Sequence, residues 1–154
     1  MDADNRLVLG GLQLFFLALL TGLLLVASPS WMANPRGVMA GHLEAAMNGM
    51  FLILVGVFYN RVSLSATQSM VCRATLLYST FANWFFTTLS GILGSSDATP
   101  IAGAGHHASP VVEQFILVAL VSVAITMVIA VVLGGPPDHW RVALCRGGLG
   151  RSQP

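Results

Sequence analysis

The sequence predicts an all-α integral membrane protein, built as a four-transmembrane-helix bundle. Of its 154 residues 55% are hydrophobic and only 8% are charged, whereas a soluble domain carries roughly 25% charged residues. Four apolar segments also reach the length of about 20 residues that crosses a bilayer. The predicted spans are residues 7–27, 38–59, 70–93 and 111–133, which make residues 1–137 a single transmembrane domain.

Local signals support each span in turn. The first span has no charged residue, and it is too long for a signal peptide and lacks a basic leader, so we expect a retained membrane anchor. Asn34 and Pro35 suit the N-cap and first position of the second span. Arg73 lies near the start of the third span, where it can snorkel. A Gly-Gly-Pro-Pro run at 134–137 ends the fourth span.

The distribution of arginine predicts the orientation. Four spans put both termini on one side, and that side would carry six of the seven arginines, leaving Arg36 alone on the other. The positive-inside rule then places both termini in the cytoplasm. Residues 138–154, with three of these arginines, are predicted to form a flexible cytoplasmic tail. A net charge of +1 is too small and dispersed for nucleic-acid binding.

Polar residues are concentrated in the outer half of this predicted bundle. Ionisable groups inside a bilayer cost several kcal/mol unless they are paired, so their default interpretation is functional. With the orientation above, the polar residues of three spans fall at one level of the membrane. They are His42, Glu44 and Asn48 on the second span, Asn83 and Thr87 on the third, and Glu113 at the start of the fourth.

His42 has two interpretations. It can be a surface histidine at the level of the lipid headgroups. It can equally be a metal or haem ligand, because neutral imidazole is the commonest biological metal ligand and a common axial ligand of haem iron.

Glu44 and Asn48 lie four residues apart and therefore share a helix face. The structural interpretation is a hydrogen bond between helices, with Arg36 as a candidate partner for Glu44. The functional interpretation is that Asn48 binds a substrate through its amide.

Small residues recur every four positions along the second span. They are Gly37, Gly41, Ala45 and Gly49. Such a stripe commonly lets a neighbouring helix approach closely. The alternative is a smooth wall against which a flat ligand lies, and one helix can use the stripe for both.

The third span carries a polar stripe, Ser79, Asn83, Thr87 and Ser90, on one face. Serine and threonine can bond to their own helix backbone, but Asn83 needs a partner. We expect this stripe to face a pocket or a neighbouring span rather than lipid. Trp84 beside it is expected to pack, with a ring-stacking wall as the alternative.

Glu113 follows two histidines of the 94–110 loop, His106 and His107. A glutamate in the first turn of a helix suits the helix dipole. A zinc site from these three residues is the alternative, although the histidines lack a recognisable zinc spacing. Motifs for serine hydrolases, nucleotide phosphates and dinucleotides are absent from the sequence.

Several motifs together resemble the hydroxylaminobenzene mutases, small four-span membrane enzymes. They are NPRGVMAGHLEAAMNGMFLILVG, YSTFANW and PIAGAGHH followed by VVEQ, and the resemblance covers residues 7–133. It implies an enzyme of the bacterial inner (cell) membrane that converts hydroxylaminobenzene to 2-aminophenol by moving the hydroxyl group from nitrogen to the ortho carbon.

The chain is more distantly similar to styrene oxide isomerases, which share a histidine matching His42, an asparagine before glycine matching Asn48, and an asparagine matching Asn83. This similarity implies a homotrimer with haem b, whose ferric iron acts as a Lewis acid. It assigns His42 as the haem ligand, beside the wall of Gly41, Ala45 and Gly49, and Asn48 as a substrate-orienting residue.

One position departs from the isomerases, because Thr87 stands where they carry a functional tyrosine. The sequence therefore favours the mutase over the epoxide isomerase. In the mutase hypothesis Asn48 and Asn83 orient the N–OH group of an aryl hydroxylamine, and Glu113 or Glu44 carries the proton.

Two non-enzymatic hypotheses remain beside it. One is a haem electron-transfer subunit, which would have to recruit His106 or His107 as a second ligand. The other is a small transporter, in whose first span an acidic residue would be expected, and the first span here has none.

Overall fold

The computed structural model describes residues 3–27, 29–62, 64–103 and 105–135, and every element in these ranges is helical. The prediction of an all-α protein is confirmed. Four long helices are joined by three short ones. The long helices are α1 (Ala3–Ala27), α2 (Pro35–Phe58), α3 (Ala66–Leu93) and α5 (Pro110–Leu133), and the short ones are η1 (Pro29–Trp31), η2 (Tyr59–Arg61) and α4 (Pro100–Gly103).

The long helices begin up to four residues before the predicted spans and end within one residue of them. Within the described residues, three segments are long and apolar enough to cross a membrane, namely Asn5–Ala27, Pro35–Arg61 and Pro110–Leu133. The fourth long helix, α3, does not meet the same criterion and is the least apolar of the four. The count of four membrane spans is therefore not confirmed.

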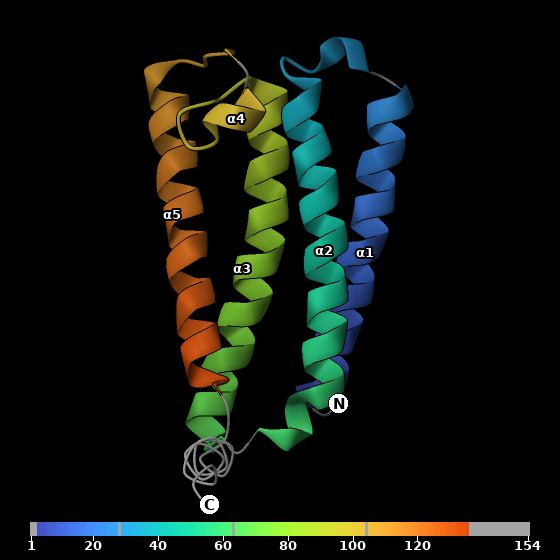
Figure 1. Cartoon of the computed structure of the whole chain (residues 1–154), viewed down its shortest axis with the longest axis vertical. Coiled ribbons are helices and arrows are strands. Elements are labelled where there is room, and N and C mark those ends of the chain that lie inside the picture. Colours follow the sequence, from blue (N-terminus) through green and yellow to red (C-terminus); the bar gives the residue numbers. More distant parts are fainter. Residues whose placement is uncertain (1–2, 28, 63, 104, 136–154) are drawn as a thin grey trace, which may run out of the picture.

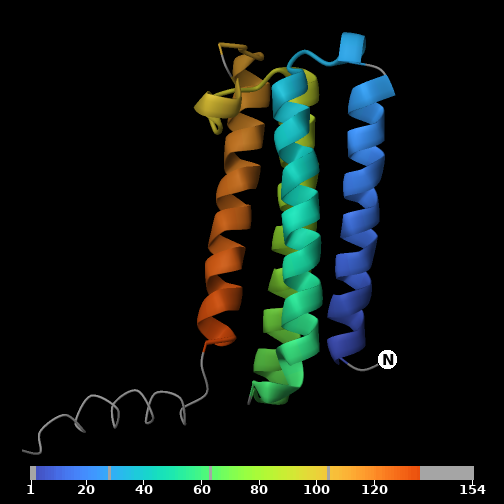
Figure 2. The same cartoon turned by 45° about the vertical axis from the view of Figure 1, so that its right-hand side comes forward.

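The long helices run alternately up and down, so the start of α1 and the end of α5 lie at one end of the molecule (Figure 1). The short helices η1 and α4 lie at the opposite end, which we call the α4 end (Figures 1 and 2). The most extensive contacts join α1 to α2, α2 to α3, and α3 to α5. The helices thus form a row in chain order, in which α2 has one neighbour on each side.

At the α4 end, one capping residue joins three elements. The Asn34 side chain accepts hydrogen bonds from the backbone N–H groups of Arg36 and Gly37, which confirms the predicted N-cap. Its amide nitrogen also donates to the carbonyl of Ala102, at 2.7 Å. Its backbone N–H donates to the carbonyl of Gly91, at 2.9 Å. The start of α2 is therefore fixed to both α3 and α4.

The small-residue stripe of α2 packs against two different neighbours. A Cβ atom on Gly37 would lie 2.6 Å from the Cα of Gly91, and one on Gly41 would collide with Thr88, both on α3. A Cβ atom on Gly49 would lie 2.9 Å from the carbonyl oxygen of Gly11 on α1. A four-residue step advances about 40° beyond one helical turn, so the stripe turns from α3 toward α1.

The outer surfaces of the helices are apolar. Large side chains such as Leu23, Val57 and Val128 are each more than 60% exposed. Together with the three long apolar helices, these surfaces identify a membrane protein. The predicted tail at 138–154 lies outside the described residues.

Candidate functional site

The polar residues of α2 lie on two faces of that helix. His42 and Glu44 are two residues apart, which separates them by about 200° around a helix. His42 contacts α1, whereas Glu44 contacts α3. Polar residues that the sequence places at one level of the membrane therefore face different helices, because neighbours in sequence need not share a helix face.

Glu44 and Asn83 form a hydrogen-bonded pair between α2 and α3. The amide nitrogen of Asn83 donates to a carboxylate oxygen of Glu44, at 2.7 Å. Both residues line an open groove of about 480 Å³. The other lining residues are mostly apolar or small and come from α2, α3, α5 and the segment around α4: Ala40, Thr87, Ala98, Thr99, Ala102, Leu120, Val123, Ala124 and Met127. We call this the Glu44 groove.

The polar stripe of α3 behaves as the sequence predicts. Ser79 and Ser90 are buried, and their hydroxyl groups donate to the backbone carbonyls of Leu76 and Ser95. Thr87 is buried and lines the Glu44 groove. Asn83, which cannot satisfy itself on its own helix, finds Glu44. The stripe therefore faces a groove and neighbouring helices rather than lipid.

Two buried polar atoms have no hydrogen-bond partner within the described ranges. They are the amide nitrogen of Asn48 and the hydroxyl oxygen of Thr88. Thr88 packs against Gly41, on the side of α2 that faces α3. Asn48 belongs to the same side of α2 by its helical position, one turn from Glu44. A buried donor without a partner costs about 1–3 kcal/mol, which is a reason to look for a ligand there.

His42 lies against α1. Its Nδ1 atom is 2.7 Å from the carbonyl oxygen of Ala18. A Cβ atom on Gly22 would lie 2.9 Å from Cε1 and 3.0 Å from Nδ1 of the same ring, so the imidazole fills the space beside this glycine. The side chain is half-buried.

Glu113 holds the chain between α3 and α5 together. Its buried carboxylate accepts hydrogen bonds from the Ser95 hydroxyl at 2.6 Å and from the backbone N–H groups of Ser96, Asp97 and Ala108 at 2.9–3.1 Å. Every one of these partners is a donor, which matches the acceptor character of a carboxylate. The role of Glu113 in this structure is to fix a loop.

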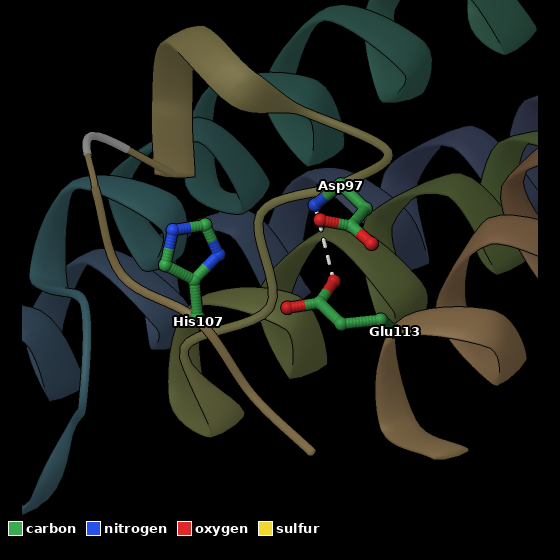
Figure 3. Close-up of side chains that lie close together, drawn as sticks. All are labelled: Asp97, His107 and Glu113. Atoms are coloured by element: carbon green, nitrogen blue, oxygen red, sulfur yellow. Dashed lines mark hydrogen bonds between the residues drawn. The ribbon is translucent and has the colours of Figure 1, made fainter. Parts of the chain in front are cut away.

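Asp97, His107 and Glu113 form a group of potential metal ligands, whose ligand atoms lie within 4.8 Å of one another. Figure 3 shows the Glu113 carboxylate turned toward the Asp97 backbone, with the His107 ring nearby. The lone pairs of Glu113 already accept hydrogen bonds from four donor groups, so a metal ion would have to displace them. The geometry thus favours a structural carboxylate over the predicted alternative of zinc.

The described residues do not support two pairings that the sequence suggested, Glu44 with Arg36 and His42 with His107. The partner of Glu44 is Asn83, so the suggested pair of Glu44 with Arg36 is wrong among the residues that the structure covers. The Nδ1 atom of His107 lies 3.3 Å from the Ser96 hydroxyl, beside α5, whereas His42 faces α1. His107 and His42 therefore lie toward opposite ends of the helix row.

Sequence reasoning missed the contribution of α1. Trp84 donates from its indole nitrogen to the Thr21 hydroxyl, at 3.1 Å, and Thr21 in turn donates to the Leu17 carbonyl. Ala18 and Gly22 of the same helical turns contact His42. The sequence signal was the glycine at position 22, beside Thr21 in the mostly apolar second half of α1, and it does not indicate which side chain fills the space.

The fold and the groove together define a class: an all-α membrane protein with a carboxylate–amide pair in an otherwise largely apolar groove. Comparison with known proteins refines this. Residues 3–135 match the family described as "Styrene oxide isomerase". The chain belongs to that family, and it is an isomerase.

Two relatives come from Ectopseudomonas oleovorans. The chain is 38% identical to hydroxylaminobenzene mutase HabB over 130 residues, which cover 84% of this chain and 77% of the relative. It is 34% identical to hydroxylaminobenzene mutase HabA over 131 residues, covering 84% of this chain and 94% of the relative. No solved structure matches the chain significantly.

Proposed function

We propose that this isomerase rearranges hydroxylaminobenzene to 2-aminophenol, moving the hydroxyl oxygen from nitrogen to the ortho carbon within one molecule. The observation that carries this proposal is the Glu44–Asn83 pair in the Glu44 groove. The two mutases that are similar over most of their length support the choice of substrate. An aryl hydroxylamine is flat and mostly apolar, so it suits a groove of this lining inside a membrane.

Residues in and beside the groove have distinct tasks in this reaction. Asn83 in the groove and Asn48, one helical turn from Glu44, orient the N–OH group, and the buried amide nitrogen of Asn48 has no hydrogen-bond partner among the described residues. Loss of the ring proton restores aromaticity after the oxygen reaches the ortho carbon. Glu44 accepts that proton and returns it to the heteroatoms, which keeps the reaction an isomerisation.

Exclusion of water determines the product. Heterolysis of the N–O bond places positive charge on the ortho and para carbons, and free water would tend to attack the para carbon. The mainly apolar groove limits that attack while the original oxygen stays close to the ortho carbon. Exclusion of water depends only on the apolar lining of the groove and on the position of the Glu44–Asn83 pair.

We further propose that His42 would hold haem b through its imidazole. The donor set fits, because Nδ1 is engaged by the Ala18 carbonyl and the other ring nitrogen remains for a metal. When bound, a ferric haem would supply a Lewis acid for the oxygen of the N–O group. The small-residue stripe does not take part in this proposal, because Gly41 and Gly49 are covered by Thr88 and Gly11 of the neighbouring helices and Ala45 is fully buried, so the stripe packs helices.

The placement of His42 and Glu44 on opposite sides of α2 supports a homo-oligomer. A haem on His42 would not face the Glu44 groove of the same chain, so we place the complete site between copies, and the resemblance to the isomerases favours a trimer. We also propose that α3 crosses the bilayer with the other three long helices. Both termini then lie in the cytoplasm and the α4 end lies outside the inner membrane.

A second candidate activity is the isomerisation of an aryl epoxide, which the name of the matching family favours. Thr87 lines the groove where the isomerases carry tyrosine, so a phenol is missing at the position where it would assist ring opening. The electron-transfer alternative loses His107 as its second ligand, because this side chain lies beside Ser96 rather than beside His42.

The test uses the full chain, purified in detergent. We expect a Soret band, and 2-aminophenol after addition of hydroxylaminobenzene. His42→Ala should lose both the band and the activity. A His42→Ala protein without haem that keeps full activity would contradict the role of His42, and a wild-type protein that forms phenylacetaldehyde from styrene oxide but no aminophenol would favour the second candidate.

A further inference from the structure

Gly22 leaves a backbone carbonyl of α1 open to a neighbouring side chain. In an α-helix the Cα–Cβ bond tilts toward the N-terminus, so the side chain at position i+4 lies over the turn that carries the carbonyl of residue i. Position 22 stands in this relation to Ala18. Because Gly22 has no side chain, the Ala18 carbonyl can be reached from α2.

His42 occupies the space that Gly22 leaves. The ring edge formed by Nδ1 and Cε1 is the part nearest to a Cβ atom built on Gly22, at 3.0 and 2.9 Å, whereas Nε2 is 3.5 Å away. The same edge reaches the Ala18 carbonyl, at 2.7 Å. A methyl group on Gly22 would therefore press on the part of the ring that makes the hydrogen bond.

This contact determines the position of the ring proton. A carbonyl oxygen can only accept a hydrogen bond, so Nδ1 must carry the hydrogen. In the neutral imidazole, Nε2 then carries the lone pair, which is the electron pair that binds a metal.

The turn of α1 that receives His42 is itself fixed. Thr21, next to Gly22, accepts a hydrogen bond from Trp84 of α3 and donates one to Leu17. The helical turn next to the receiving carbonyl is thus held by a contact from α3 as well as by its own helix.

We infer that Gly22 is a positioning residue: it exposes the Ala18 carbonyl to the Nδ1–H group of His42 and so leaves Nε2 free to bind a metal centre. This inference rests on the proposed function for the identity of that centre as haem iron. Engagement of the distal N–H group by a carbonyl orients a histidine ligand and raises its basicity, and loss of such a contact typically lowers metal affinity about 10–100-fold.

The experiment compares wild type with Gly22→Ala. Gly10→Ala is the matched control, because it is the same substitution on the same helix and its close contact is with the end of the Leu77 side chain rather than with His42. Each full-length protein is labelled with 15N-histidine and prepared without haem, and the His42 signals are assigned by their loss in His42→Gln. Ferric protoporphyrin IX is then added, and affinity and midpoint reduction potential are measured.

We expect protonated Nδ1 and unprotonated Nε2 on His42 of wild type and Gly10→Ala, and loss of this single tautomer in Gly22→Ala. Gly22→Ala should also bind ferric protoporphyrin IX about 10–100-fold more weakly. Its midpoint potential should be more positive, since a less basic ligand stabilises ferric iron less.

Two results would overturn the inference: a hydrogen on Nε2 of wild-type His42, or a Gly22→Ala protein that matches wild type in both tautomer and affinity. A third result separates the two proposals. If wild type shows the Nδ1–H tautomer, Gly22→Ala loses it and no variant binds the porphyrin, then the positioning role of Gly22 stands and the haem hypothesis fails.

Discussion

Glu44 and Glu113 are two carboxylates in the same helix row with opposite surroundings. Glu113 is buried and accepts hydrogen bonds from one hydroxyl and three backbone N–H groups. Glu44 is half-buried, accepts one hydrogen bond from a side chain and lines an open groove. Burial together with four fixed donors makes Glu113 a structural carboxylate, whereas partial exposure and a single donor leave Glu44 available for chemistry.

Removal of the Glu113 carboxylate should have the largest effect on stability. Glu113→Ala leaves the Ser95 hydroxyl and the backbone N–H groups of residues 96, 97 and 108 without their acceptor, and each unsatisfied buried donor costs about 1–3 kcal/mol. We expect a loss of at least about 3 kcal/mol in the free energy of unfolding. Thermal unfolding in detergent micelles measures it.

Glu113→Gln provides a milder version, because the amide oxygen can still accept from some of these donors. Its stability should fall between those of Glu113→Ala and wild type. A Glu113→Ala protein as stable as wild type would show that the loop does not depend on this carboxylate.

Glu44→Gln should lower activity while leaving stability nearly unchanged. The amide oxygen of glutamine can still accept from Asn83, so stability should change by less than about 1 kcal/mol. The proton acceptor is lost, so kcat for 2-aminophenol formation should fall about 10²–10⁴-fold with KM nearly unchanged. Steady-state kinetics with hydroxylaminobenzene measures both constants.

Asp97→Asn is the matched control for Glu44→Gln, since Asp97 is an exposed carboxylate between α3 and α4 and plays no part in the proposed reaction. It should keep wild-type kinetics. Unchanged kcat in Glu44→Gln would exclude Glu44 as the proton acceptor.

The sequence predicts the helices well, because long apolar runs bounded by Asn34-Pro35 and by Gly134 must satisfy their backbone hydrogen bonds internally in a membrane, and a helix does so. It also predicts that Asn83 needs a partner, because an amide cannot satisfy itself on its own helix. The sequence did not identify that partner as Glu44, for which it suggested Arg36 instead, because the pairing depends on the rotation of α2 against α3.

The sequence did not predict the division of the polar residues between the two faces of α2. Helical periodicity separates positions 42 and 44, but the assignment of one face to α1 and the other to α3 depends on the order of the helices in space. The role of Glu113 depended on the loop backbone at residues 96, 97 and 108, whose N–H directions no side-chain pattern specifies.

The central claim is an isomerisation in which the substrate keeps its own oxygen. Wild-type protein incubated with hydroxylaminobenzene in water enriched in oxygen-18, followed by mass spectrometry of the product, tests it most directly. The account predicts 2-aminophenol without the label. Labelled aminophenol, or 4-aminophenol as the main product, would show that solvent water supplies the hydroxyl group and would contradict it.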